Sequence, residues 1–452
     1  MTRFTKPIPT PRTASGWLWG GLLALVLAAC GGLEQAPVAN GGTPGSDHAY
    51  IANVSIDADA DRASVEAAYG GQVVVWRPEA GFAVLGLDEA NGAVSRLNTL
   101  TSNRSVFAIA PAVTAAEPSG ASRSGVSAWA GGVSAWAGGV SAWAGGVSAW
   151  SDGVDGWADG SNPFPGNDAM WAQINLSQAQ GLATNLGHGV VVAVIDTGID
   201  LYHGGLVGRL TDSSAWLDTI DGNAYPHESA DVMAMGPYFG HGTAAAGIIL
   251  QAAPLATIMP IRVLSAEGFG NATDVAIAID HAITHGAHVI NLSLGTAQPV
   301  SAITQMIEYA QKLGIIMVAS SGNNGTTAVT YPAATAVQAG FPLAIGVGSV
   351  DGADQKSWFS TYGSGLEMLA PGESVGTLFP DGGIAYANGT SFAAPWVSGV
   401  AALALGQGAD PQRAPSLVSS SLFIDGLNPG YTGMLGAGRL DGFAAVSAML
   451  AD

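Results

Sequence analysis

Cysteine is almost absent from this sequence. The chain has 452 residues and a single cysteine, Cys30. A disulfide joins two cysteines, so no disulfide within the chain supports the fold, and stability has to come from the core. Such a core is available, because 48% of the residues are hydrophobic and only 11% are charged. This composition is typical of a globular protein with a large core and excludes a disordered chain.

Basic residues are also scarce. The sequence has 14 Lys and Arg against 34 Asp and Glu, which gives a formal net charge of −20. Proteins that bind phosphate backbones need a basic surface, and this chain does not have the residues to form one. Nucleic acid is therefore excluded as a partner.

The N-terminus has the charge and hydropathy pattern of an export signal. Three basic residues precede an apolar run over residues 16–29, which is too short to span a membrane comfortably. The run ends in Leu27-Ala-Ala-Cys30, which resembles a bacterial lipobox, where the cysteine becomes the lipidated first residue after cleavage. We therefore expect a signal peptide at 1–29, lipidation at Cys30, and an exported protein at the cell surface, in the periplasm or at the outer membrane. The alternative is an ordinary secretory signal that contains a cysteine by chance.

A flexible tether and a small folded domain are expected next. Residues 30–45 are rich in Gly, Pro, Ala and Asn, as in a tether. Residues 46–115 have a compact α+β pattern, with alternating strand runs and two helical stretches. The expected strands are 49–56, 72–76, 81–85 and 106–110, and the expected helices are 60–69 and 93–100.

A tandem repeat occupies residues 116–162. Its unit is Gly-Val-Ser-Ala-Trp-Ala-Gly, and its tryptophans, spaced by seven residues, are Trp129, Trp136, Trp143, Trp150 and Trp157. Each unit contains two glycines, and each glycine costs about 1 kcal/mol relative to alanine in a helix. We therefore predict a low-complexity linker. The alternative is a contact element whose indoles lie among lipid headgroups or stack on sugars.

Strands and helices alternate in residues 163–452, which form the largest predicted domain. The expected strands are 190–195, 258–264, 287–294, 315–320 and 343–350, and helices are expected at 273–285, 302–313 and 391–405. This alternation predicts a mainly parallel sheet with helices on both faces. The active site of such a sheet lies at the carboxyl ends of its strands, and Asp196 directly follows one of them.

Three short motifs in this domain carry groups suited to nucleophilic catalysis. Asn388-Gly-Thr-Ser-Phe-Ala-Ala-Pro395 leads into an Ala-rich helix, so Ser391 is expected at a helix start, where the positive end of the dipole favours an oxyanion. Gly240-His-Gly-Thr243 places His241 at another helix start, and Asp196 ends an apolar strand. Each residue also has a structural interpretation: Ser391 as a cap, His241 as a core histidine and Asp196 as a loop cap.

Taken together, these motifs resemble those of the subtilisin-like serine proteases. The order Asp196, His241, Ser391 is the order of that family, and 289–295 (Val-Ile-Asn-Leu-Ser-Leu-Gly) and 318–325 (Val-Ala-Ser-Ser-Gly-Asn-Asn-Gly) match further family motifs. The resemblance extends from about Trp171 to the C-terminus. It implies a subtilisin-like α/β fold. It also implies that residues 46–115 are an inhibitory propeptide domain of the small α+β, ferredoxin-like kind, whose C-terminal tail lies in the active-site cleft.

The resemblance also assigns roles to single residues. His241 is expected as general base, Asp196 as its partner, Ser391 as nucleophile and Asn323 as a donor in the oxyanion hole. The expected walls of the substrate pocket are Ser293, Leu294, Gly295, Ala319, Ser320, Ser321 and Gly322, with Thr330 at the base. Many relatives have glycine at the position of Thr330, so a shallower pocket that disfavours large aromatic residues is expected.

No metal site or cofactor is predicted. The Asn-rich insertion that wraps a tight calcium site in many relatives is missing after His241. Weak calcium binding by an acidic segment is left open, although such a charge run is more often a solvated loop; its members are Asp212, Asp218, Asp221, Glu228 and Asp231. A zinc site at His281, His285 and His288 is disfavoured, because the segment has no HExxH glutamate.

The sequence thus predicts a lipid-anchored, monomeric serine endopeptidase made as a self-processed zymogen. Its partners would be protein or peptide substrates, its own propeptide as inhibitor, and a membrane through the N-terminal lipid. Cleavage between the propeptide and catalytic domains would release the catalytic domain. The rival interpretation is a surface binding protein that uses the Trp repeats and carries a protease-like scaffold. A dedicated processing protease with one substrate is a third interpretation, and the substrate preference and maturation site are left open.

Overall fold

A computed structural model describes most of the two predicted domains. It covers residues 48, 50–87, 106–111, 126–127, 164–228, 238–266 and 268–451. The predicted signal peptide, the lipidation site Cys30, the tether and the five repeat tryptophans lie outside the described residues, as does the predicted helix at 93–100. Among the described helices, none combines the length and the apolar character needed to cross a membrane.

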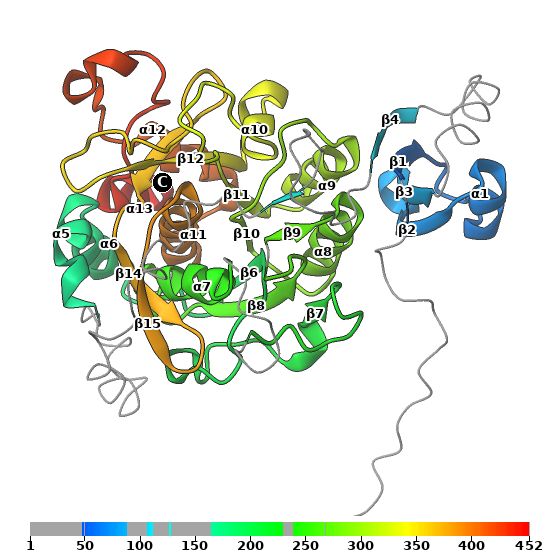
Figure 1. Cartoon of the computed structure of the whole chain (residues 1–452), viewed down its shortest axis with the longest axis horizontal. Coiled ribbons are helices and arrows are strands. Elements are labelled where there is room, and N and C mark those ends of the chain that lie inside the picture. The colour runs from blue at the N-terminus through cyan, green and yellow to red at the C-terminus, as the bar shows by residue number, and fades with distance from the viewer. Residues whose placement is uncertain are drawn as a thin grey trace, which may run out of the picture. The chain divides into compact units, whose positions relative to one another are not determined.

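A seven-stranded parallel sheet is the centre of the larger domain (Figure 1). Every neighbouring pair of strands in it is parallel, which confirms the predicted architecture. The strand order is β13 (Met368–Pro371), β12 (Ala344–Val350), β11 (Ile316–Ser320), β10 (Val289–Leu292), β6 (Val191–Asp196), β8 (Thr257–Arg262) and β7 (Leu217–Asp218).

The strand order reverses beside β6. The chain passes from β6 to β8 on one side of it and then places β10 on the other side. At such a switch point the connections leave in opposite directions and open a crevice at the carboxyl ends of the strands. Asp196 ends β6, and Ser293 directly follows β10, so both residues lie at this crevice.

Two helical layers cover the sheet because the strand residues alternate between its faces. Val192, Val194 and Ile316 belong to one core with α7 (His241–Ala252) and α11 (Thr390–Gly406). Ala193, Ile195 and Met317 belong to the other core with α8 (Ala272–Thr284) and α9 (Ser301–Lys312). Figure 1 shows α8 and α9 on one side of the strands and α7 and α11 on the other.

Small residues let α7 and α11 pack closely. All 12 residues of α7 are buried, and most of α11 is buried as well. At the crossing, a Cβ placed on Gly399 would lie 2.4 Å from the Cβ of Ala252. The two helices therefore approach at a distance that only glycine permits.

The remaining elements are short and complete the domain. The helices are α5 (Asp168–Gln173), α6 (Leu176–Leu182), α10 (Ala333–Ala339), α12 (Pro415–Ser419) and α13 (Gly442–Leu450). A hairpin is formed by β14 (Val375–Phe379) and β15 (Gly383–Ala387). Single 3₁₀ turns occur in this domain at Pro165–Asn167, Gly204–Leu206, Ser213–Ala215, Pro411–Arg413, Asp425–Leu427 and Pro429–Tyr431, and a further one, Pro78–Ala80, lies in the N-terminal domain.

The N-terminal domain is an antiparallel sheet with a helix. The strand order is β2 (Gln72–Arg77), β3 (Phe82–Leu87), β1 (Tyr50–Ser55) and β4 (Val106–Pro111), as in a ferredoxin-like sheet. Helix α1 (Arg62–Tyr69) begins where Asp61 accepts the N–H of Ser64, and it ends at Gly70 with φ +70°. These elements match the strand–helix–strand–strand order expected from the sequence.

The N-terminal sheet contacts helices α8 and α9. Ile51, Phe82 and Val84 share one hydrophobic cluster with residues of these helices. At the edge of the contact, Arg77 Nε donates to Asp280 Oδ1 at 2.6 Å. The small domain is therefore held by both apolar burial and a cross-domain ion pair.

Residues Val126 and Ser127 form a short strand, β5, within the segment predicted as linker. This strand pairs antiparallel with β9 (Phe269–Gly270), with Val126 opposite Gly270 and Ser127 opposite Phe269. Part of the chain that follows the N-terminal domain is therefore an added strand on the edge of the larger domain.

Candidate active site

Asp196, His241 and Ser391 lie at the end of one strand and at the starts of two helices, which come together in the fold. Asp196 is the last residue of β6, His241 the first residue of α7 and Ser391 the second residue of α11. Gly240, at φ +87°, makes the turn into α7. All three side chains are buried, at 0%, 2% and 0% exposure. The packing of α7 on α11 thus sets the positions of the histidine and the serine.

Asp196 and His241 form a direct hydrogen bond. His241 Nδ1 lies 2.7 Å from Asp196 Oδ1, and the Thr197 N–H donates to the same oxygen at 2.7 Å. A Cβ on Gly242 would lie only 2.1 Å from the carbonyl oxygen of Gly198, so glycine is needed for this close approach. Burial alone would lower the pKa of His241, but the charge and hydrogen bond of Asp196 outweigh it and raise that pKa.

Ser391 lies next to this pair and exchanges hydrogen bonds with Ser293. Ser391 Oγ donates to the Ser293 carbonyl at 3.2 Å, and Ser293 Oγ donates to the Ser391 carbonyl at 2.7 Å. The ring of Phe392 lies 5.0 Å from that of His241, centroid to centroid. In the part of the chain that the structure describes, His241 Nε2 is buried without a hydrogen-bond partner. A bond from Ser391 to His241 therefore requires the hydroxyl to leave the Ser293 carbonyl.

Pro395 explains why the Ser391 carbonyl is available to Ser293. Helix α11 begins at Thr390 and contains this proline in its second turn. A proline there has no N–H to donate to the carbonyl four residues earlier, which is that of Ser391. Ser293 Oγ supplies the missing donor, and Asn291 Nδ2 in turn donates to Ser293 Oγ at 2.9 Å.

Asn323 is oriented by the residue that precedes Ser391. Its Oδ1 accepts hydrogen bonds from Thr390 N at 2.8 Å and Thr390 Oγ1 at 3.0 Å. The Gly322 N–H donates to Thr390 Oγ1 at 3.1 Å, which fixes the hydroxyl direction. With its oxygen held in this way, the amide presents Nδ2 as the donor group at its other end.

The two predicted walls of the substrate pocket leave neighbouring parallel strands. Leu292 pairs with Ala319, so Ser293–Gly295 and Ala319–Gly322 both emerge at the carboxyl ends of β10 and β11. Thr330 is buried against the second wall, with its N–H donating to Ser321 O at 3.1 Å. A Cβ on Gly322, whose φ is +104°, would lie 2.8 Å from Thr330 Cγ2. The methyl group of Thr330 therefore lies against the wall at Gly322.

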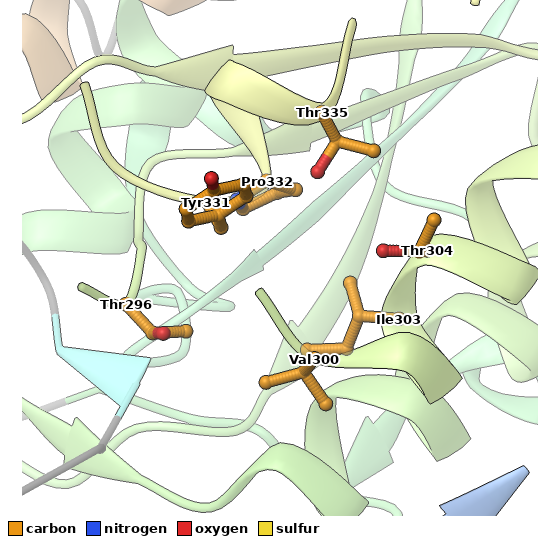
Figure 2. Close-up of a pocket in the computed structure, with 7 residues that line it drawn as sticks. All are labelled: Thr296, Val300, Ile303, Thr304, Tyr331, Pro332 and Thr335. Carbon is orange, nitrogen blue, oxygen red and sulfur yellow. The ribbon is translucent and has the colours of Figure 1, made fainter. Parts of the chain in front are cut away.

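A small hollow lies beside these walls (Figure 2). Tyr331 and Pro332 face Val300 and Ile303 across it, and its volume is about 180 Å³ including the open side. None of the predicted pocket residues lines it. Thr296 and Tyr331, which form a β-bridge at this hollow, directly follow Gly295 and Thr330, so the hollow adjoins the predicted pocket.

The structure adds two residues that the sequence analysis did not place at the site. Asn291 joins Ser293 to Ser398, whose Oγ donates to Asn291 Oδ1 at 2.9 Å. Glu228 was expected in a solvated acidic loop, and this is wrong, because its side chain is completely buried beside the Asp196–His241 pair. The only sequence signal for Asn291 is its position inside the motif of residues 289–295.

The candidate metal-binding groups that the structure describes do not lie together in one site, and Asp231 lies outside the described residues. Asp218, also expected in the solvated loop, is buried and paired with Arg262 Nη1 at 2.9 Å. His281 and His285 stack with ring centroids 3.8 Å apart, and His288 Nδ1 accepts the Val191 N–H. Within the described ranges, no group of three or more His, Cys, Asp or Glu side chains is arranged to hold a metal ion.

A buried aspartate–histidine pair beside a serine at a helix N-terminus defines the class of serine hydrolases. The sequence profile of the Subtilase family matches residues 187–418. Thermitase of Thermoactinomyces vulgaris is 38% identical over 246 residues, which cover 52% of this chain and 81% of the relative. Subtilisin Savinase of Lederbergia lenta is 34% identical over 261 residues, which cover 57% of this chain and 91% of the relative. The chain belongs to the subtilase family and is a serine-type endopeptidase.

A solved structure agrees with this assignment. The prenylagaramide maturation protease PagA is 25% identical, with a TM-score of 0.50 over 60% of this chain and 98% of that chain. The subtilisin-like α/β fold expected from the motifs is confirmed.

Proposed function

We propose that this chain is a lipid-anchored endopeptidase that hydrolyses peptide bonds through an Asp196/His241/Ser391 triad and is made as a self-processed zymogen. The observation that carries the proposal is the 2.7 Å bond between Asp196 and His241 at the N-terminus of α7. Ser391 lies at the adjoining N-terminus of α11. Both helix starts direct positive dipole ends toward the place where negative charge develops.

The geometry supports a general-base mechanism. His241 Nε2 takes the proton of Ser391 as Oγ attacks the substrate carbonyl, and the imidazolium then gives this proton to the leaving amine. Asp196 keeps the Nδ1 proton in place and stabilises the imidazolium. Water then takes the place of the leaving amine. His241 takes a proton from the water as it attacks the acyl carbonyl, and Ser391 Oγ leaves with that proton. Oxyanion stabilisation falls to Asn323 Nδ2 and the backbone N–H of Ser391.

Inhibition by the N-terminal domain is supported by the strand β5. Its partner β9 lies close to the triad, because Leu264 N donates to Asp196 O at 3.1 Å and Ser265 N donates to Phe269 O at 2.9 Å. A peptide in the place of Val126–Ser127 therefore runs past the catalytic groups as an antiparallel strand. Substrates would bind in the same way, which makes the precursor segment their competitor.

Anchoring and release follow from the domain order. Cys30, at the end of the lipobox-like sequence, precedes both folded domains. Lipidation there would attach the propeptide side of the molecule to the membrane. Cleavage between the two domains would then leave the catalytic domain held only by noncovalent contacts, so degradation of the propeptide would release it from the envelope.

The decisive experiment compares wild type with Ser391→Ala. We expect wild-type protein to be shortened and to hydrolyse casein, and the variant to stay full-length and inactive. Ser419→Ala, an exposed serine in α12, is the control and should behave as wild type. Intact mass and N-terminal sequencing give the maturation site. Because Val-Ser-Ala-Trp recurs every seven residues, we expect new N-termini that differ by seven residues.

Two other outcomes would count against the proposal. Processing and casein hydrolysis by Ser391→Ala would exclude Ser391 as the nucleophile. If both proteins remained full-length and inactive, activation would need a second protease, or the rival interpretation as a surface binding protein would be favoured.

A further inference from the structure

Glu228 is a buried acid beside the triad that the mechanism above does not use. Its side chain is completely enclosed, and its backbone N–H donates to Ile199 O at 3.0 Å, three residues beyond Asp196. Placing a carboxylate in the interior is costly unless hydrogen bonds replace its hydration. The partners of Glu228 therefore indicate why it is there.

Four hydrogen bonds converge on this carboxylate. Oε1 accepts from Thr197 Oγ1 at 2.8 Å and from Gly240 N at 2.7 Å. Oε2 accepts from Thr243 Oγ1 at 2.7 Å and from Thr243 N at 3.2 Å. Both oxygens are thus fully used, and two of the partners are backbone N–H groups, which can only donate.

The two threonine hydroxyls are donors as well. Thr197 Oγ1 already accepts the Gly242 N–H at 3.0 Å, and Thr243 Oγ1 accepts the Asp200 N–H at 2.9 Å. Each hydroxyl proton therefore points to Glu228. Four donors, three of them at the N-terminus of α7, fit an ionised carboxylate, whereas a protonated carboxyl would direct a hydrogen at one of them.

The same contacts connect the two sides of the Asp196–His241 pair. Thr197 follows Asp196 and also donates its N–H to Asp196 Oδ1 at 2.7 Å. Gly240 precedes His241, and Thr243 lies two residues after it. Glu228 thus links the end of β6 to the start of α7, the two elements whose relative position sets the aspartate–histidine distance.

We propose that Glu228 is a positioning residue of the hydrolytic site, which clamps Asp196 against His241 and adds a second negative charge behind the imidazolium. The inference rests on the proposed triad mechanism. A merely structural glutamate would contribute to folding alone, whereas this role requires an effect on the titration of His241.

Among the described residues, two charged groups act on His241. Asp196 faces it from β6 and Glu228 from the segment before α7, and the charge of each raises the pKa of His241. The Tyr238 ring lies 6.4 Å away and is neutral in this pH range, since burial raises the pKa of Tyr238 further. Burial raises the pKa of Glu228 to about 7, against the lowering effect of its hydrogen bonds. On the far side of Glu228, His227 and Asp200 lie 3.9 Å apart and form a separate pair.

The test measures His241 directly in a form of the protein that cannot process itself. NMR titration of the imidazole is compared between Ser391→Ala and Ser391→Ala/Glu228→Gln. Loss of the nearby negative charge should lower the pKa of His241 by about one unit. Glu367→Gln in the same background is the matched control. Burial also raises the pKa of Glu367 to about 7, but its carboxylate accepts from Gly346 N, away from the triad.

Kinetics with a small peptide substrate give the second readout. Glu228→Gln should reduce kcat by about tenfold to a hundredfold with little change in KM, since misplacement of a catalytic group affects the chemical step. The acidic limb of its pH profile should move to lower pH. Glu228→Asp keeps the charge, so the acidic limb of its pH profile should return to the wild-type position while kcat stays reduced. An unchanged His241 titration, or a lowered melting temperature with normal kcat, would overturn the proposal.

A milder variant covers the case in which Glu228→Gln does not fold. Thr197→Val removes the hydroxyl that joins Glu228 to Gly242 and leaves the carboxylate in place. It should lower kcat without moving the acidic limb, and full activity would contradict the clamp. The triad mechanism is tested by a separate experiment, since peptide hydrolysis by Ser391→Ala would refute it. The His241 titration does not depend on activity, so it would still decide the role of Glu228.

Discussion

Thr330 is the residue that most directly limits the predicted specificity pocket. Its hydroxyl donates to Ser320 O at 3.3 Å, and its methyl group faces Gly322. We therefore expect wild type to prefer small residues at P1, and Thr330→Gly to raise kcat/KM for Phe or Tyr at P1, relative to Ala, by about tenfold or more. A peptide library that varies only P1 measures this ratio.

Thr330→Ser is the graded control for this prediction. It keeps the hydroxyl and removes only the methyl group, so its preference should lie between those of wild type and Thr330→Gly. Cleavage by wild type chiefly after Phe or Tyr would show that the methyl group does not limit the pocket.

The residues of the site differ in how far the sequence reveals them. Asp196, His241 and Ser391 each stand in a contiguous motif with a strand or helix signal beside it, so their chemistry can be predicted. Glu228 cannot be found in this way, because its partner Thr197 is 31 residues away and no strand or helix motif stands beside it in the sequence. Its burial depends on α7 packing against β6, which is a property of the fold and not of the local pattern.

At the scale of elements, the contact between the N-terminal sheet and α8 combines apolar burial with the cross-domain ion pair of Arg77 and Asp280. Arg77 and Asp280 retain 18% and 22% side-chain exposure, so their attraction is only partly screened. If the proposed self-cleavage occurs, we expect Asp280→Asn to weaken the complex that remains after it, raising the Kd of that complex by about threefold to tenfold. Native mass spectrometry or gel filtration of the cleaved protein measures the fraction that stays associated.

Another ion pair provides the control for Asp280→Asn. Lys312 and Glu308 form a pair within α9, at 62% and 39% exposure, and do not bridge the domains. Lys312→Ala should therefore leave the Kd unchanged. If both substitutions weakened the complex equally, general charge would control the association and the Arg77–Asp280 contact would have no special role.

Long elements are predicted well from this sequence, and short ones are not. Helices α8, α9 and α11 lie close to their expected bounds, because each has ten or more residues with a clear apolar pattern. The four-residue strand β13 and the hairpin β14–β15 were not expected. All residues of β13 and β14 are buried and four of the five residues of β15 are half-buried, so no alternation of buried and exposed positions marks these segments as strands.

At the scale of the whole molecule, buried acids connect stability to pH. Burial raises the pKa of Asp274 and of Glu367 to about 7, from ordinary values of 3.8 for the aspartate and 4.5 for the glutamate. Between those values and about pH 7, the folded chain binds more protons than the unfolded chain, so the free energy of unfolding falls as pH rises. Self-repulsion of a chain with net charge −20 acts in the same direction.

We therefore expect the melting temperature of Ser391→Ala protein to be higher at pH 5 than at pH 8. Glu367→Gln should reduce this difference, because it removes one group whose proton binding changes on unfolding. Glu308→Gln makes the same change of charge on the exposed face of α9 and should leave the difference nearly as it is. If both variants reduced the difference in melting temperature equally, the pH dependence would come from net charge alone. A melting temperature that rose from pH 5 to pH 8 would mean that these acids are ionised in the folded protein at low pH, with their hydrogen bonds outweighing the cost of burial.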